Sequence, residues 1–192
     1  MKTEVQRLNE FLKIAPEMIR ENKPLIDFLT NEGFFKAPAS TKYHGNYPGG
    51  LYDHSLKVYD HLSNLTNNCN LDWMREESPF IVGMFHDLCK IDQYEEIEDC
   101  AGKVMFGSTE AEGRVVHYEY KKELTLSGHG VKSVMILSTF LQLTYEEVLC
   151  IRYHMGAYEK DDWTGFDLAI RKYPNVLFTH TADMLASKVD ET

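Results

Sequence analysis

The side chains with the clearest chemical potential in this 192-residue chain are an adjacent histidine and aspartate, His86 and Asp87. They lie within the apolar run from Phe80 to Lys90, where a buried charge is costly unless it is paired or coordinates a metal. The plainer interpretation is a core histidine bonded to its neighbour or to a surface lysine. The dipeptide by itself favours that plainer interpretation.

Further histidines and an aspartate follow at intervals of about 25 to 42 residues, each long enough for a separate helix and its connection. The candidates are His54 or His61, His86, Asp87, His129, His154 and Asp183. Side chains on facing helices of a bundle are a known way to build a metal site. Imidazole and carboxylate without thiolate suit Fe, Mn, Co, Ni or Zn better than Mg or Ca. Each histidine alone could equally be a packed or hydrogen-bonded core residue.

Helical periodicity supplies elements that could position these residues. Apolar residues at helical spacing predict a helix over 3–14, and Pro24 can open a second helix over 25–32 that Gly33 would end. We expect residues 1–35 to form N-terminal packing helices.

The stretch from Lys36 to Gly50 is rich in glycine and proline and predicts a long loop. Loops of this length in compact domains often carry function, and Lys42, Tyr43 and Tyr47 lie in this one. A solvated connection is the alternative.

A helix is predicted over 51–65, and a central helix is predicted to begin with Ser78 as its N-cap and to carry His86 and Asp87 about two turns in. His54 and His61 are seven residues apart on the first of these helices and share a face, so periodicity does not choose between them.

Helical periodicity is lost between Ile91 and Thr125. Residues 103–106 and 114–120 carry β-branched and aromatic side chains around glycines, which predicts a hairpin. The expected fold class is therefore all-α with a small β-hairpin excursion around residues 101–120.

Three further helices, over 128–141, 144–156 and 174–189, would carry His129, His154 and Asp183, with one short helix after Gly165. Thr144 and Glu147 form a capping-box pattern at the start of the second of these helices.

Composition limits the possible partners. The formal net charge of −10 works against non-specific binding to duplex DNA or to anionic membranes. No apolar run approaches the ~20 residues of a membrane span, and no signal peptide is visible, so we expect a cytoplasmic protein.

The four cysteines show no C-x-x-C spacing and are expected to be reduced. The sequence does not indicate an oligomeric state.

The order of these residues, with "GGLYDHSLKV" around His54 and "GMFHDLCK" around His86, resembles the HD-domain metal-dependent phosphohydrolase superfamily. The length of 192 residues predicts that residues 1–192 form a single domain. The resemblance covers roughly residues 45–189, favours His54 over His61, and implies that these residues form an all-α HD core that binds the metal. One departure is Cys89, which stands where the superfamily usually has glycine.

The resemblance also implies the ligands. One metal would be held by His54, His86, Asp87 and Asp183. In members that bind a second ion, two more histidines take part, and His129 and His154 match those, with Asp87 bridging. Whether His129 and His154 hold that second ion, or serve a single-metal site as phosphate ligands and proton donors, is left open by the spacing. One or two divalent transition-metal ions are thus expected.

The implied activity is hydrolysis of a phosphate ester or anhydride of a nucleotide or short oligonucleotide through a metal-activated hydroxide. Asp87, Lys90, His129 and His154 are the expected catalytic residues. The Lys90 cation could hold a phosphate oxygen, or it could pair with Asp87 or Asp92 at the helix end.

Candidates for binding the substrate are Lys42, Tyr43, Tyr47, Tyr94, Trp163 and Arg171. Aromatic side chains among them could stack on a base. Two other functions are consistent with the same residues. One is a di-iron oxygenase, because some relatives use this ligand set to activate O₂. The other is an inert regulatory module that binds a metal or nucleotide.

Overall fold

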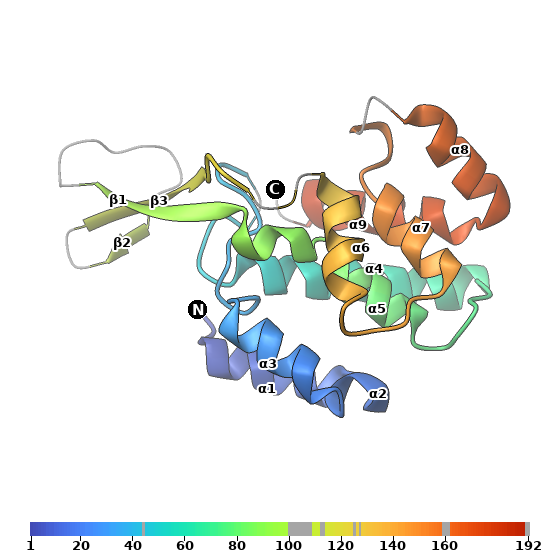
Figure 1. Cartoon of the computed structure of the whole chain (residues 1–192), viewed down its shortest axis with the longest axis horizontal. Helices are drawn as coiled ribbons and strands as arrows, with labels where there is room; N and C mark the ends of the chain where they lie inside the picture. The colour runs from blue at the N-terminus through green and yellow to red at the C-terminus, as the bar shows by residue number, and fades with distance from the viewer. Residues whose placement is uncertain are drawn as a thin grey trace.

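The computed structural model describes residues 1–43, 45–99, 109–111, 114–124, 126, 128–158 and 162–190. The described chain is mostly helical, with a small antiparallel sheet that extends away from the helices (Figure 1). The predicted fold class, all-α with a small β excursion, is confirmed.

The helical elements in chain order are α1 (Glu4–Ile14), α2 (Glu17–Arg20), α3 (Lys23–Asn31), α4 (Gly50–Cys69), α5 (Ser78–Phe85), the 3-10 helix η1 (Leu88–Asp92), α6 (His129–Leu137), α7 (Tyr145–Tyr153), the 3-10 helix η2 (Gly156–Tyr158), α8 (Trp163–Lys172) and α9 (Asn175–Lys188). The strands are β1 (Tyr94–Asp99), β2 (Thr109–Ala111) and β3 (Arg114–Tyr120).

The N-terminal helices pack against the rest of the core. Phe11 of α1 is fully buried, with its ring centroid 5.7 Å from that of Phe35 and 5.6 Å from that of Phe80. Arg7 of α1 donates from Nε and Nη2 to the two carboxylate oxygens of Asp53 on α4. This ion pair fixes α1 against the helix that also carries His54.

Helices α4 and α5 form the centre of the core. Every residue of α5 is buried, which agrees with its apolar sequence. A Cβ added at Gly83 would lie 2.6 Å from the Cα of Tyr59, so only glycine allows the two helices to approach this closely.

The prediction that the central helix continues through His86 and Asp87 is wrong. Helix α5 ends at Phe85 with His86 as its C-cap, and Asp87 has φ −102° and ψ 18° before η1 begins. The predicted N-cap is also displaced by one residue, because Ser78 is already helical and its hydroxyl donates to Glu147 on α7.

Strand β3 confirms the prediction over 114–120 and pairs antiparallel with β1, with Tyr94 opposite Tyr120. The predicted strand over 103–106 lies outside the described residues. Strand β1 was not predicted. It contains Glu95, Glu96, Glu98 and Asp99, residue types that are uncommon in strands.

The capping box at α7 is confirmed, with Glu147 N 3.2 Å from Thr144 Oγ1 and Thr144 N 2.8 Å from a Glu147 carboxylate oxygen. Helix α7 ends three residues before the predicted end at Gly156, and α6 ends at Leu137 rather than at residue 141. Helix α9 agrees with its prediction within one residue at each end.

Candidate metal centre

Five helices and the turn after α5 bring six candidate ligands together. The site combines His54 on α4, His86 at the end of α5, Asp87 before η1, His129 at the start of α6, His154 at the end of α7 and Asp183 on α9. His61, the alternative on α4, instead pairs with Asp190 at 2.6 Å.

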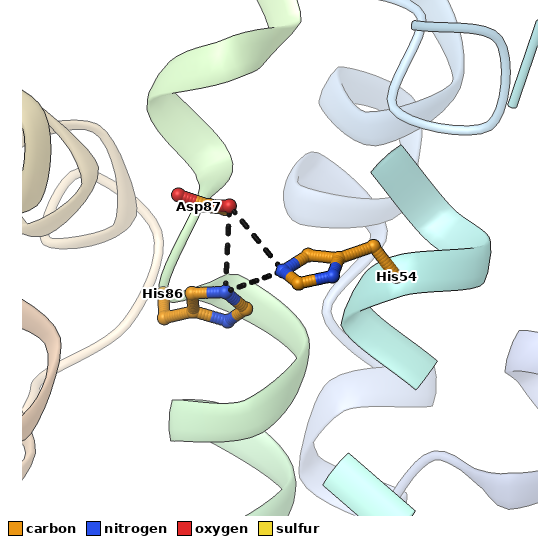
Figure 2. Close-up of side chains that lie close together, drawn as sticks. All are labelled: His54, His86 and Asp87. Carbon is orange, nitrogen blue, oxygen red and sulfur yellow. Dashed lines mark hydrogen bonds and ion pairs between the residues drawn. The ribbon is translucent and has the colours of Figure 1, made fainter. Parts of the chain in front are cut away.

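One compact group of buried ligand atoms is formed by His54, His86 and Asp87 (Figure 2). The Nε2 atoms of the two histidines are 3.3 Å apart, and they lie 3.6 Å and 3.4 Å from Asp87 Oδ2. Asp183 Oδ1 completes this side of the site at 3.2 Å from His54 Nε2 and 3.9 Å from His86 Nε2.

The other carboxylate oxygen of Asp87 faces two more histidines. His129 Nε2 lies 2.6 Å and His154 Nε2 lies 3.4 Å from Asp87 Oδ1. The two oxygens of Asp87 therefore face different pairs of imidazoles, which is the position that a bridging carboxylate would need.

Backbone carbonyls orient two of the rings. The Nδ1 atoms of His86 and His154 lie 2.8 Å from the carbonyl oxygens of Gly83 and Ile151. A carbonyl only accepts, so each Nδ1 donates its hydrogen and each Nε2 presents a lone pair to the site. Hydrogen bonds of this kind commonly fix the tautomer of metal-binding histidines.

Burial and charge act together on the site. Burial alone would raise the pKa of Asp87, but the Lys90 ammonium, His86 and His129 outweigh it and hold that pKa well below its usual range. Burial opposes ionisation of Asp183 as well, yet bonding to His54 keeps its pKa low. Both carboxylates are therefore negatively charged at neutral pH.

The imidazoles respond differently to the same surroundings. Burial dominates at His86 and lowers its pKa, despite the nearby Asp87 carboxylate. Burial would also lower the pKa of His154, but its interaction with Asp87 outweighs that effect and raises the pKa.

These residues could hold a metal ion. Three of them, His54, His86 and Asp87, are buried and offer ligand atoms within 4.8 Å of one another. His154 Nε2 is also buried and has no aligned hydrogen-bond partner among the residues that the structure describes. A buried imidazole nitrogen that faces a carboxylate oxygen at 3.4 Å, without an aligned hydrogen bond, is an arrangement suited to a metal-binding histidine.

Sequence reasoning missed one neighbour of the cluster. Cys89 offers its sulfur within 4.8 Å of ligand atoms of Asp87 and His129, and its Sγ lies 3.5 Å from His129 Nδ1. Burial is the main cause that raises the pKa of this thiol to about 12, so it is a neutral thiol at physiological pH.

A cavity of about 290 Å³ opens beside the cluster. Its lining includes Asp87, Lys90, His129 and Asp183 from the site, together with Ala39, Ser40, Tyr43, Gln93, Tyr94, Tyr120, Met155, Tyr158, Met184, Ser187 and Lys188. Lys90 Nζ lies 2.6 Å from Asp87 Oδ2, so the lysine pairs with Asp87. Its alternative partner, Asp92, pairs with Lys132.

Of the six predicted substrate contacts, Tyr43 and Tyr94 line this cavity, and Lys42 lines a neighbouring one. The structure places the other three elsewhere. Tyr47 lines a separate cavity near the N-terminus, Trp163 stacks on Phe166, and Arg171 pairs with Asp167.

Sequence reasoning missed several lining residues of the cavity. A signal existed for Ser187, which is one helical turn after Asp183 and so shares its face. Met155 and Tyr158 carry no comparable signal, because they come from the turn after α7 and from the short 3-10 helix η2.

Within the part of the chain that the structure describes, no helix combines the length and the apolar character needed to cross a lipid bilayer. Comparison with known proteins gave no assignment: no protein-family model, no curated protein and no solved structure matches the chain.

Proposed function

We propose that this protein is a metal-dependent phosphohydrolase of the HD type that acts on a phosphate ester or anhydride of a nucleotide or short oligonucleotide. The observation that carries the proposal is the arrangement around Asp87, whose two oxygens face separate pairs of histidines. An adjoining cavity that combines a lysine with tyrosines is suited to a phosphate attached to an aromatic ring.

A divalent ion bound by these residues would lower the pKa of a coordinated water and neutralise charge on the phosphoryl oxygens. The residues of the chain have three further tasks. Burial of the imidazoles keeps the ligand rotamers fixed, Lys90 holds a non-bridging phosphate oxygen, and the cavity orients the rest of the substrate. Among the ligands around Asp87, His129 is the most exposed, with 20% of its side-chain surface accessible. It therefore lies where the substrate can reach it.

The test begins with elemental analysis of the purified protein, followed by a panel of nucleotides and oligonucleotides with Mn²⁺, Co²⁺ and Ni²⁺. We expect metal-dependent release of phosphate or nucleotide that Asp87→Ala abolishes. His61→Ala is the matched control, because His61 lies on the same helix as His54 but outside the cluster, and it should retain activity. Full activity of Asp87→Ala would refute the proposal.

Two further measurements separate the alternatives. Hydrolysis should proceed without O₂, whereas a di-iron oxygenase would stall anaerobically. Metal content should fall by about one equivalent in His129→Ala if two ions bind, and an unchanged content would contradict a two-metal site. The absence of turnover across the whole panel would favour an inert binding module.

A further inference from the structure

A second cavity, of about 430 Å³, adjoins the one beside the metal cluster. It is lined by Ser40, Thr41, Lys42, Tyr43, Tyr118, Glu119 and Tyr120. The two cavities share Ser40, Tyr43 and Tyr120, but none of the cluster ligands lines the second. The second cavity therefore continues from the first past the tyrosines and away from the cluster.

The sheet supplies a row of tyrosines between the two cavities. Tyr94 and Tyr120 are register partners on β1 and β3, with ring centroids 5.1 Å apart, and Tyr118 is two residues from Tyr120 on the same face. The Tyr94 hydroxyl donates to the carbonyl oxygen of Ala39 at 3.4 Å, which seats the loop against this face. One aromatic wall thus runs from the cluster into the second cavity.

The two tyrosine rings that line both cavities are accessible to a ligand. Tyr120 is 59% exposed and Tyr43 is 78% exposed, although both line the cavities. An exposed tyrosine ring at the wall of a cavity offers a face on which a planar base can stack. Lys42 and Glu119 place one positive and one negative side chain in the second cavity, so it carries no net charge and suits a neutral nucleoside.

We propose that the second cavity binds the second organic group of a phosphodiester, namely the nucleoside on the far side of the scissile phosphate. The inference rests on the proposed function and narrows it from phosphate esters in general to diesters. A phosphomonoester has one organic group, which the first cavity can hold, and it would leave the second cavity without a ligand.

The proposed reaction is a simple hydrolysis of the phosphodiester. Water forms a new bond to phosphorus, and one ester P–O bond breaks. The leaving oxygen takes a proton from water and departs as an alcohol. The products are one nucleoside with a free hydroxyl and one nucleoside monophosphate.

The experiment compares two diesters of equal charge: a dinucleoside monophosphate and the methyl ester of the same nucleoside monophosphate. The two diesters differ in the second ester group, which is a nucleoside in the first compound and a methyl group in the second. We expect the dinucleoside monophosphate to have a kcat/KM about tenfold higher, the scale of one stacked base. Tyr120→Ala should remove this preference, and Tyr120→Phe, which keeps the ring, should restore it. Tyr145→Ala, which removes an exposed tyrosine that lines neither cavity, should leave the preference unchanged.

Equal kcat/KM values for the two diesters, or an equal loss for both in Tyr120→Ala, would overturn the inference while the proposed function stands. Failure to cleave any ester with any metal would instead overturn the proposed function. Binding to the second cavity can then still be measured without turnover, by NMR titration in EDTA. The dinucleoside monophosphate should bind about tenfold more tightly than the methyl ester, and Tyr120→Ala should equalise the two Kd values. Equal Kd values in the parent would refute the subsite.

Discussion

Lys90 Nζ lies 2.6 Å from Asp87 Oδ2, the same carboxylate oxygen that faces His54 and His86. Burial would lower the pKa of Lys90, but the Asp87 carboxylate outweighs that effect and raises it, so the ammonium is charged at neutral pH. A fixed positive charge therefore stands beside the proposed ion site, where it repels a metal ion and attracts a phosphate.

Replacing this lysine should change metal binding and catalysis in opposite directions. Lys90→Met removes the repulsion, so the Kd for Mn²⁺ measured by calorimetry should fall about tenfold. The same variant loses a contact to the phosphate, and kcat should fall by about 10²-fold. Weaker Mn²⁺ binding in Lys90→Met would show that the lysine supports the ligands rather than competing with the ion.

A bound ion should stabilise the folded chain. At a free concentration 100 times its Kd, an ion adds about 2.7 kcal/mol to the free energy of unfolding. For a chain of this size, that corresponds to a rise in Tm of about 5–10 °C relative to the protein in EDTA. His86→Ala should abolish the rise, whereas His61→Ala, on the helix of His54 but paired with Asp190 outside the cluster, should keep it. An equal rise in both variants would place the ion elsewhere.

The metal-free protein should lose stability in acid. The low pKa values of Asp87 and Asp183 mean that the folded state binds protons less readily than the unfolded state. Their contribution is fully present above the unfolded pKa, near 4, and is lost as pH falls through the lower folded values. Urea unfolding in EDTA should show this loss below about pH 4, and Asp87→Asn, which does not titrate, should show a smaller one. Identical pH profiles for the two proteins would contradict the prediction.

Close packing at Gly83 should be sensitive to a single methyl group. Gly83→Ala pushes a Cβ against the Tyr59 backbone and should lower the free energy of unfolding by about 1–3 kcal/mol. It should also weaken metal binding, because the Gly83 carbonyl orients His86. Gly33→Ala is the comparison: at φ +85° it is strained but distant from the ligands, so it should cost stability and leave the metal Kd unchanged. Parental metal affinity in Gly83→Ala would show that the displacement of α5 does not reach His86.

Local signals in the sequence predicted local structure well. The capping box of Thr144 and Glu147 and the positive φ of Gly33 depend on contacts within a few residues, so both could be predicted from the sequence. The end of α5 could not, because the apolar pattern continues past Phe85 and the turn is set by packing around His86 and Asp87. Strand β1 forms despite its acidic residues because β3 pairs with it along its whole length.

The site was predictable in residue type but not in geometry. Spacing indicated which helices could carry ligands, yet it could not choose between His54 and His61. In the structure His61 pairs with Asp190, outside the cluster. The cavity depends on segments distant in sequence, such as the loop with Tyr43 and the turn with Met155, so spacing alone could not separate Tyr94 from Trp163 as a cavity residue.

The turn that ends α5 also joins the ligands to the sheet through a short stretch of chain. Asp87 is followed directly by η1, and η1 is followed within two residues by β1, so about seven residues separate Asp87 from Tyr94. Helix α6 holds this short segment in place through the Ser133 hydroxyl, which accepts from Cys89 N. The strand that carries Tyr94 is therefore tied to Asp87 and Lys90 by one short segment that is hydrogen-bonded to α6, so a substitution in this segment should disturb the ligands and the wall of the cavity together.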